Sequence, residues 1–278
     1  MTRTAKRYKG KVALVTGASG GQGQSQVRML AEEGAAVVLA DVVDGPARKL
    51  ARDIKKSGGR AIFVHLDVTS AAEWKNAIRR IRSEFGALHV LINNAGVISR
   101  TGIDRITMDE WSRVINVNLM GPMLGIKTAA PLIRDSGGGA IVNIGSTAAL
   151  AAHRGVAYTS SKWGVRGLTS CAAMEYLDWG IRVNAVHPAQ VSDTGISAHA
   201  TPAYRSSNQR IMPMKRAARP DEVTSAVLFL ASDDASYINA ADLTIDGGAL
   251  NFGLTRVRKL IEEDYVREQR PAGVRKAK

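Results

Sequence analysis

Tyr158 and Lys162 stand four residues apart in the segment Tyr-Thr-Ser-Ser-Lys, a spacing that places both side chains on one face of a helix. A tyrosine hydroxyl ordinarily has a pKa of about 10, and a neighbouring cation lowers the pKa of a phenol because it stabilises the phenolate. Such a pair could therefore supply a general acid or base near neutral pH. It could equally be a surface tyrosine and lysine on an amphipathic helix, so its meaning depends on the rest of the chain.

Short apolar strands alternate with longer helical patterns on either side of this pair. The predicted strands lack polar alternation, which is typical of strands buried on both faces of a sheet. Repeated strand–helix units predict an α/β fold with a parallel, doubly wound sheet. Helices are expected over residues 24–33, 46–57, 72–85 and 157–179, with a long helical stretch between 93 and 140. Strands are expected over residues 12–16, 36–40, 61–66, 90–93, 140–144, 181–186 and 243–245.

Bulk properties narrow the classes of function. The chain has 278 residues, a formal net charge of +13 and a single cysteine, Cys171, so no intramolecular disulfide can form. No apolar run approaches the roughly 20 residues that span a bilayer, and we expect no membrane association. A basic surface can bind nucleic acid, but no nucleic-acid motif accompanies the charge, and no nucleic-acid partner is expected. These properties predict a soluble cytoplasmic protein.

A glycine-rich segment, Thr-Gly-Ala-Ser-Gly-Gly-Gln-Gly, joins the first strand to the first helix. Glycine permits a sharp turn and a close approach of the backbone to a ligand, and a helix N-terminus offers free N–H groups to a pyrophosphate. A plain glycine-rich connector is the alternative, but the strand–turn–helix context favours a dinucleotide site. The candidate binding residues here are Gly17, Ser19, Gly21, Gln22 and Gly23.

Asp41 stands at the end of the second strand, where a carboxylate can accept hydrogen bonds from the adenosine ribose and would repel a 2′-phosphate. No Lys or Arg occurs in residues 18–26 to offset that charge, so NAD is predicted over NADP. A turn or helix-capping role is the alternative for Asp41, and also for Asp67 at the end of the third strand. Further candidates at the strand ends are Val68, Asn94, Ala95 and Gly96.

Together these motifs resemble those of the short-chain dehydrogenase/reductase family over about residues 8–250. The resemblance implies a single-domain, Rossmann-like fold with a seven-stranded parallel sheet. It also implies an enzyme that uses a nicotinamide dinucleotide and assembles as a homotetramer or a dimer. The motifs stand in the family's order: the 16–23 loop, Asp67, the 93–96 run, Asn118, Ser146, Tyr158 with Lys162, and Asp246-Gly247-Gly248.

The resemblance assigns four catalytic residues. Tyr158 would be the general acid in carbonyl reduction and the base in alcohol oxidation, while Lys162 would lower its pKa and hold the nicotinamide ribose. Ser146 would hydrogen-bond the substrate oxygen as charge develops on it. Asn118 would support a water-mediated proton path to Lys162. In isolation, Ser146 could be a turn hydroxyl and Asn118 a buried amide. The stretch that meets the nicotinamide is matched by Pro188, Val191 and Thr194.

Two segments depart from the strand–helix alternation. Residues 188–219 are polar and are expected to form a long substrate loop with short helices over the mouth of the fold. Beyond residue 251, apolar side chains at helical spacing predict a short amphipathic helix, and disorder is expected from Pro271. We therefore expect a dinucleotide-binding catalytic domain over residues 1–255, which includes the loop, and a basic C-terminal extension over 256–278.

Three departures from the family pattern stand out. The interval from Ser146 to Tyr158 is one residue short, which should reshape one wall of the substrate pocket and leaves Thr147 as an alternative hydroxyl. Ala189 replaces a glycine after Pro188 and is expected to adopt the needed extended backbone. The pair Ala240-Ala241 replaces a glycine before the last strand, with no consequence that the sequence reveals.

The substrate is the least determined feature. Residues 160–168 look similar to bacterial NAD-linked hydroxysteroid dehydrogenases, so we expect a bulky secondary alcohol or ketone, such as a steroid or terpenoid. No charged cluster is expected to address the substrate, His153 and Arg154 are interpreted as exposed loop residues, and no metal is expected. Two alternatives remain. One is a ketoacyl-carrier-protein reductase, which would suit the basic surface, and the other is a non-catalytic dinucleotide-binding scaffold.

Overall fold

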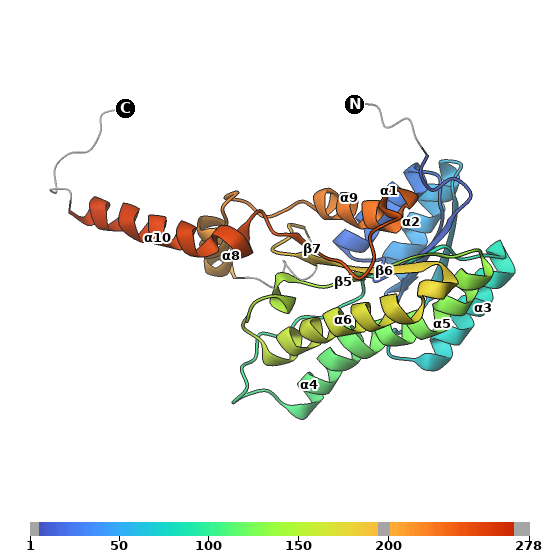
Figure 1. Cartoon of the computed structure of the whole chain (residues 1–278), viewed down its shortest axis with the longest axis horizontal. Helices are drawn as coiled ribbons and strands as arrows, with labels where there is room; N and C mark the ends of the chain where they lie inside the picture. The colour runs from blue at the N-terminus through green and yellow to red at the C-terminus, as the bar shows by residue number, and fades with distance from the viewer. Residues whose placement is uncertain (1–5, 194–200, 270–278) are drawn as a thin grey trace.

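A computed structural model describes residues 6–193 and 201–269, and within them the chain folds around one seven-stranded parallel sheet (Figure 1). The strand order is β3-β2-β1-β4-β5-β6-β7, which confirms the predicted doubly wound α/β fold. The strands are β1 (Val12–Thr16), β2 (Ala36–Asp41), β3 (Arg60–His65), β4 (Val90–Asn93), β5 (Gly139–Ile144), β6 (Ile181–Pro188) and β7 (Asp242–Ile245).

The order of the strands reverses between β1 and β4, and this reversal creates the site. The chain moves outward from β1 to β3 on one side, then returns to pair β4 with β1. Helices leaving the two neighbouring strands therefore go to opposite faces, and a crevice opens at the carboxyl ends of the strands. All five residues of β1 are buried, as expected for a central strand covered on both faces.

Two layers of helices cover the sheet (Figure 1), and each layer has its own apolar core. One layer packs Leu30, Leu50 and Val227 against the sheet, and the other packs Trp74, Ile126 and Ala172. The first layer contains α1 (Gly21–Glu32), α2 (Asp44–Lys56) and α9 (Pro220–Ala231). The second contains α3 (Ala71–Phe85), α5 (Gly121–Asp135) and α6 (Val156–Glu175), with α4 (Met108–Ile115) beside α6.

Two helices differ from the sequence prediction. The long helical stretch expected between β4 and β5 is interrupted by a π-helical turn, Asn116–Met120, which separates α4 from α5. Helix α9 was not predicted, although its start carries recognisable signals. Pro220 is at the first helical position, and the side chain of Glu222 accepts a hydrogen bond from the Arg219 backbone at 2.8 Å.

Helices α8 (Pro202–Ile211) and α10 (Ala249–Glu268) lie together and project beyond the sheet (Figure 1). Helix α8 confirms that the predicted substrate loop contains helix. Helix α10 is longer than the short helix expected from the sequence, and it runs through the proposed domain boundary at residues 255/256. The predicted disorder from Pro271 lies outside the described residues. Within the described residues, no helix has the length and apolar character needed to cross a membrane.

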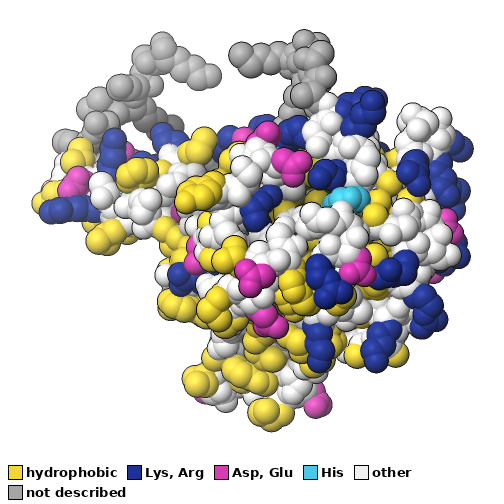
Figure 2. Space-filling model, turned by 45° about the vertical axis from the view of Figure 1, so that its right-hand side comes forward, with side chains coloured by type: hydrophobic (Ala, Val, Ile, Leu, Met, Phe, Trp, Pro, Cys, Tyr) yellow, Lys and Arg dark blue, Asp and Glu magenta, His cyan; other side chains and the backbone are white. Residues whose placement is uncertain are grey.

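The charged surface is mixed on the face that Figure 2 shows. Lys and Arg side chains are spread over this face, with Asp and Glu side chains among them. Several of the basic residues are held in surface ion pairs, such as Arg82 with Asp135 and Arg216 with Glu222. The net charge of +13 is therefore distributed and is not gathered on this face into one basic patch.

Two alanines replace glycines of the family pattern, and they differ in backbone conformation. Ala189 is outside the set of positive-φ residues, and its N–H donates to the Ile245 carbonyl at 3.1 Å, so its backbone avoids the left-handed region that favours glycine. Ala240 has φ +57°, a left-handed conformation that glycine adopts at no steric cost. The departure at Ala240 therefore stores backbone strain in the turn before β7.

Ala240→Gly should stabilise the protein by about 0.5–1 kcal/mol, because the relief of left-handed strain exceeds the added entropy of the unfolded chain. Ala241→Gly is the matched control, since Ala241 is not in the left-handed region. It should cost about 0.5–1 kcal/mol. Urea unfolding of both variants measures the difference, and a destabilised Ala240→Gly protein would contradict the strain argument.

Candidate active site

The glycine-rich turn between β1 and α1 is built around close backbone contacts. A Cβ atom on Gly23 would lie 2.2 Å from the Gly17 carbonyl oxygen, and one on Gly17 would lie 2.8 Å from the Cα of Ala95. Gly17 also has φ +65°. Helix α1 begins at Gly21 with no side-chain cap. The turn therefore leaves backbone N–H groups at a helix N-terminus open to an anion.

The side chain of Asn94 braces this turn from the end of β4. Its Nδ2 donates to the Thr16 carbonyl at 2.8 Å and to the Gly17 carbonyl at 3.2 Å. Its Oδ1 accepts from Gln26 at 3.2 Å. The Asn94 side chain thus holds the shape of the glycine turn, while the residue also lines the cleft beside it.

Asp41 ends β2 with a fixed carboxylate. Its two oxygens accept backbone N–H groups of Ser19 and Val43, each at 2.8 Å, and the side chain is largely buried. The Ser19 hydroxyl donates to the Val43 carbonyl at 2.6 Å and therefore supports the same turn. The predicted residues Asp41 and Ser19 are therefore in direct contact. Asp41 faces the cleft, whereas Ser19 is not among its lining residues.

A cleft of about 790 Å³ follows the carboxyl ends of β1, β2 and β4. Asp67 lines it while its carboxylate also accepts from the backbone and hydroxyl of Thr69, each at 2.8 Å, so the capping alternative and the cleft position both hold. Thr194 lies outside the described residues. The predicted cofactor residues that line this cleft are Gly17, Gly21, Gln22, Gly23, Asp41, Asp67, Val68, Asn94, Ala95 and Gly96.

Tyr158 and Lys162 lie on the buried face of α6. Tyr158 is 8% exposed and Lys162 is 5% exposed, which excludes the alternative of a surface pair. The Lys162 Nζ donates to the Ile144 carbonyl at 2.8 Å and lies 5.7 Å from the centroid of the Tyr158 ring. Both residues line a second cavity, as do the predicted residues Pro188 and Val191.

Burial dominates the acidities of this pair. Desolvation raises the pKa of Tyr158, while a hydrogen bond with Ser146 and the charge of Arg100 act in the opposite direction. Desolvation lowers the pKa of Lys162 to about 8. The expected lowering of the Tyr158 pKa by Lys162 is not found in the chain itself. The ammonium is directed at the Ile144 carbonyl, and burial outweighs the attractive charges.

Ser146 is the hydroxyl that reaches Tyr158. A hydrogen bond between the two side chains lowers the Tyr158 pKa, and the Ser146 hydroxyl accepts the Ala148 N–H at 3.1 Å. Thr147, the alternative from sequence, begins the 3-10 turn Thr147–Ala149 and also lines the cavity. The geometry therefore favours Ser146 over Thr147.

The short loop before Tyr158 ends at Gly155, which packs against the backbone of Ser99. Gly155 has φ +101°, and a Cβ atom there would lie 2.0 Å from the Ser99 carbonyl oxygen. The neighbouring Val156 N–H donates to the Thr101 carbonyl at 3.1 Å. The loop thus packs directly on residues 99–101, which sets the position of this wall of the cavity.

Asn118 is committed to structural hydrogen bonds. It lies in the π-helical turn and is 1% exposed. Its Oδ1 accepts the Val97 N–H at 2.8 Å, and its Nδ2 donates to the Val97 carbonyl at 2.9 Å and to Ser161 at 3.2 Å. The side chain of Asn118 is therefore a buried amide with all of these groups hydrogen-bonded inside the protein. Its effect is to join the segment after β4 to the helix that carries Tyr158.

His187 is a positioning residue that the sequence analysis missed. The ring is fully buried at the end of β6, its Nε2 lies 2.7 Å from an Asp242 carboxylate oxygen, and the Ser146 N–H donates to its Nδ1 at 3.3 Å. Arg166 donates to the other oxygen of Asp242 at 2.8 Å. A Cβ atom on Gly145 would lie 2.2 Å from Nδ1, so glycine is required where the ring packs.

The protonation of this network follows from its burial. Desolvation lowers the pKa of His187, and the Asp242 hydrogen bond opposes that effect only in part. The ring Nδ1 lies within hydrogen-bond distance of both the Ser146 N–H, at 3.3 Å, and the Ser146 carbonyl oxygen, at 3.2 Å, so Ser146 meets His187 in either tautomer of the ring. The network thus fixes the backbone of Ser146. The sequence offered His-Pro at a strand end as a signal, but gave no indication of the partner in β7.

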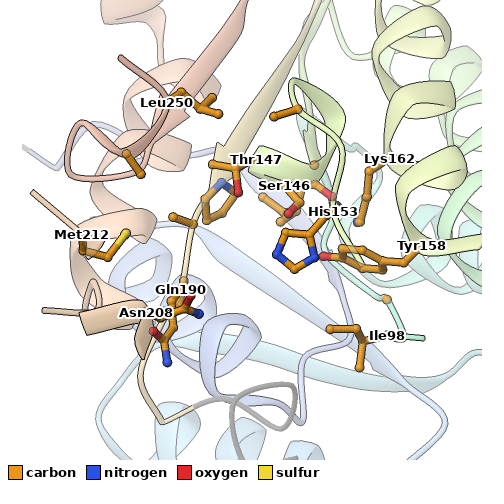
Figure 3. A pocket seen from close by; sticks show the side chains of 18 of the residues that line it. Ile98, Ser146, Thr147, His153, Tyr158, Lys162, Gln190, Asn208, Met212 and Leu250 are labelled. Carbon is orange, nitrogen blue, oxygen red and sulfur yellow. Dashed lines mark hydrogen bonds between the residues drawn. The ribbon is translucent and has the colours of Figure 1, made fainter. Parts of the chain in front are cut away.

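The second cavity has a volume of about 300 Å³ and adjoins the cleft (Figure 3). Gln22, Asn94, Gly96, Ile98 and Arg100 line both spaces. Catalytic candidates stand on one side of the cavity, and Asn208 and Met212 stand on the side of α8. A molecule in this cavity would therefore touch Tyr158 and Ser146 while remaining open to the dinucleotide cleft.

The sequence shows no cluster of charged residues for the substrate pocket, but the cavity is lined by individual basic side chains. Arg100 lines the cavity, and His153 does so despite being exposed, whereas Arg154 does not line it. The sequence gave no signal for Arg100, because it follows β4 in an irregular segment with no motif of its own.

The buried ammonium makes stability depend on pH. Because the pKa of Lys162 is about 8 in the folded protein and 10.5 for an ordinary lysine, the unfolded chain binds more protons between those pH values. The contribution of Lys162 to stability must therefore rise as pH increases through this window. Between pH 7 and 9.5 the free energy of unfolding of the wild type should rise by about 2 kcal/mol relative to Lys162→Met. Urea unfolding at both pH values checks this, and parallel pH dependences would contradict a depressed pKa.

Most of the chain matches a known protein family. A family model described as Enoyl-(Acyl carrier protein) reductase matches residues 17–250. The matched range contains the glycine-rich turn, the strand-end residues, Ser146 and the Tyr158–Lys162 pair.

Two curated relatives are dehydrogenases of hydroxylated ring compounds, as their names state. The chain is 41% identical over 255 residues to trans-4-hydroxycyclohexanecarboxylate dehydrogenase of Sinomonas cyclohexanicum, covering 89% of this chain and 96% of the relative. It is 39% identical to 3-alpha-(or 20-beta)-hydroxysteroid dehydrogenase of Mycobacterium tuberculosis, covering 88% and 91%.

A solved structure supports the same fold. The gluconate 5-dehydrogenase of Burkholderia cenocepacia J2315, determined with NADP and tartrate, superposes with a TM-score of 0.82 at 31% identity. The match covers 87% of this chain and 96% of that chain.

Proposed function

We propose that this chain, which belongs to the short-chain dehydrogenase/reductase family, uses NAD to oxidise a secondary alcohol on a ring and to reduce the corresponding ketone. The chain is an oxidoreductase that transfers hydride between a nicotinamide dinucleotide and a secondary alcohol. The choice of NAD and the ring-bearing substrate are the proposal. The observation that carries it is the meeting of Tyr158, Ser146 and Lys162 where the cavity adjoins the cleft.

The residues of the cleft fit a dinucleotide. A Cβ atom at Gly17 or Gly23 would collide with backbone, so the turn keeps the surface that a pyrophosphate needs. Gly17, Gly21, Gln22 and Gly23 would hold the phosphates, and Asp41 would hold the adenosine ribose. Pro188 and Val191 line the cavity near the expected nicotinamide, and Lys162 would hold its ribose. The bound nicotinamide would supply or accept the hydride.

The chain's own residues move the proton. In alcohol oxidation, Tyr158 accepts the hydroxyl proton as the carbonyl forms, and in reduction it returns the proton to the oxygen. Ser146 hydrogen-bonds that oxygen and is held in place through its N–H by His187. Lys162 stabilises the phenolate once the tyrosine is deprotonated. We retain for Asn118 a role in a proton path to Lys162, and its fixed side chain holds the surrounding segment.

An assay of ring-bearing secondary alcohols tests the function. Cyclohexanol, 4-substituted cyclohexanols and hydroxysteroids should reduce NAD with the wild type. Tyr158→Phe should lower kcat by at least about 100-fold while the dissociation constant of NADH stays unchanged, because the hydroxyl acts in proton transfer. Retained turnover in Tyr158→Phe would overturn the mechanism. Absence of turnover with every alcohol, in the presence of normal NADH binding, would favour the scaffold alternative.

Asp41 supports NAD over NADP, because its fixed carboxylate stands where a 2′-phosphate would lie. Asp41→Asn should raise the ratio of kcat/KM for NADP to that for NAD by about 10- to 100-fold, since the repulsion of one full charge is removed. Asp44→Asn is the control, because Asp44 is exposed on α2 and does not line the cleft. An unchanged ratio in Asp41→Asn, or equal use of both dinucleotides by the wild type, would refute this assignment.

The assembly is also part of the proposal. We infer a homotetramer or a dimer, supported by the free edge of β7 and by exposed apolar side chains on α9 and α10. Phe229 on α9 is 37% exposed, and Leu254 and Ile261 on α10 are 86% and 64% exposed. Exposed apolar side chains of this size are typical of interfaces. The basic extension from residue 256 would contribute to this contact through α10.

A cytoplasmic location is proposed on the single cysteine. Cys171 is an exposed free thiol, a state that a reducing compartment preserves. A ketoacyl-carrier-protein reductase remains the alternative enzyme, favoured by the net charge of +13 and opposed by the position of Asp41.

A further inference from the structure

Three side chains from separate segments meet at the substrate cavity. Arg100 follows β4, His153 precedes α6, and Tyr204 lies on α8, and all three line the cavity. The Arg100 guanidinium carbon lies 5.4 Å from the centroid of the Tyr204 ring. The Tyr204 hydroxyl lies 3.4 Å from Nε2 of His153. One part of the cavity lining therefore carries a cation and two polar groups.

Arg100 has no Asp or Glu partner within the residues that the structure describes. Every Asp and Glu of the sequence lies within residues 6–193 and 201–269, and none of the ion pairs found there includes Arg100. Other arginines near the site are paired, including Arg166 with Asp242 and Arg210 with Asp264. A half-buried guanidinium without an anion loses part of its hydration and gains little in return. An anion on the ligand would supply that partner.

The contact with Tyr204 indicates whether Arg100 binds a phosphate of the cofactor or an anion on the substrate. Arg100 also lines the dinucleotide cleft, so a phosphate of the cofactor is one candidate. Tyr204 and His153, however, line the cavity and not the cleft. Stacking on Tyr204 keeps the guanidinium on the cavity side, where the substrate would lie.

We propose that Arg100, with the Tyr204 hydroxyl and His153, binds a carboxylate carried by the substrate, so that the enzyme acts on alicyclic hydroxy acids. Two parallel N–H groups of the guanidinium suit the two oxygens of a carboxylate. The hydroxyl of the same ring would then meet Tyr158 and Ser146. The inference rests on the proposed function and names the class of its substrate.

A pair of substrates that differ in charge tests the inference. Trans-4-hydroxycyclohexanecarboxylate and its methyl ester carry the same reacting hydroxyl and differ in charge. Arg100→Gln should lower kcat/KM for the acid by about 10- to 100-fold, mainly through KM, and leave kcat/KM for the ester unchanged. Arg154→Gln is the matched control, because it removes the same charge from the neighbouring loop outside the cavity. It should change neither value.

The other outcomes each contradict the inference in a distinct way. Equal losses for acid and ester in Arg100→Gln would show that Arg100 supports Tyr158 or the fold. Weaker NADH binding would show that it contacts the cofactor. No change with either substrate would remove Arg100 from recognition while the dehydrogenase function stands.

A binding measurement separates this inference from the proposed function. Cyclohexanecarboxylate lacks the reacting hydroxyl, so its binding to the enzyme with NADH does not require turnover. Calorimetry should give an affinity about 10- to 100-fold weaker for Arg100→Gln than for the wild type. Equal affinities would overturn the carboxylate site even in an active enzyme. A clear difference would support it even if no alcohol were oxidised.

Discussion

The buried hydrogen bond from the Lys162 ammonium to the Ile144 carbonyl is the interaction on which the site depends. It joins the middle of α6 to the end of β5 at 2.8 Å. A charged group in this position costs free energy, since burial lowers the Lys162 pKa to about 8. The rest of the fold must hold α6 against the sheet despite that cost. It does so through the apolar core that contains Ile141, Ala172 and Val183.

Close backbone contacts at glycines position the other segments of the site. Gly155 presses on the Ser99 carbonyl, Gly17 presses on Ala95, and Gly145 makes room for the His187 ring. Each of these contacts joins segments far apart in the chain, and none leaves space for a Cβ atom. Small residues here allow the strand ends, the cofactor turn and the loop before Tyr158 to meet within one crevice.

Hydrogen bonds then orient the reacting groups. His187 receives the Ser146 N–H from one side, while Asp242 and Arg166 hold the ring from the other. Asn118 joins Val97 to the turn of α6 that carries Tyr158. His187 and Asn118 are more deeply buried than Tyr158, as is expected where a fixed geometry must be kept beside an open cavity.

The sequence by itself determined the fold class and, through its motifs, the class of reaction. Continuous apolar strands must be covered on both faces, which indicates a sheet between two layers of helices. The glycine turn that enters the first helix is a local pattern, and so is the four-residue spacing of Tyr158 and Lys162, so both can be recognised in the sequence. Tertiary structure decided the features that depend on contacts between distant segments. It hydrogen-bonded His187 to Ser146 and Lys162 to Ile144, and it made burial outweigh nearby charge in setting the pKa of Tyr158. It also brought Arg100, His153 and Tyr204 to one cavity wall. Residues in separate segments, such as Arg100 and Tyr204, share no periodicity in the sequence, so only the folded chain could bring them together.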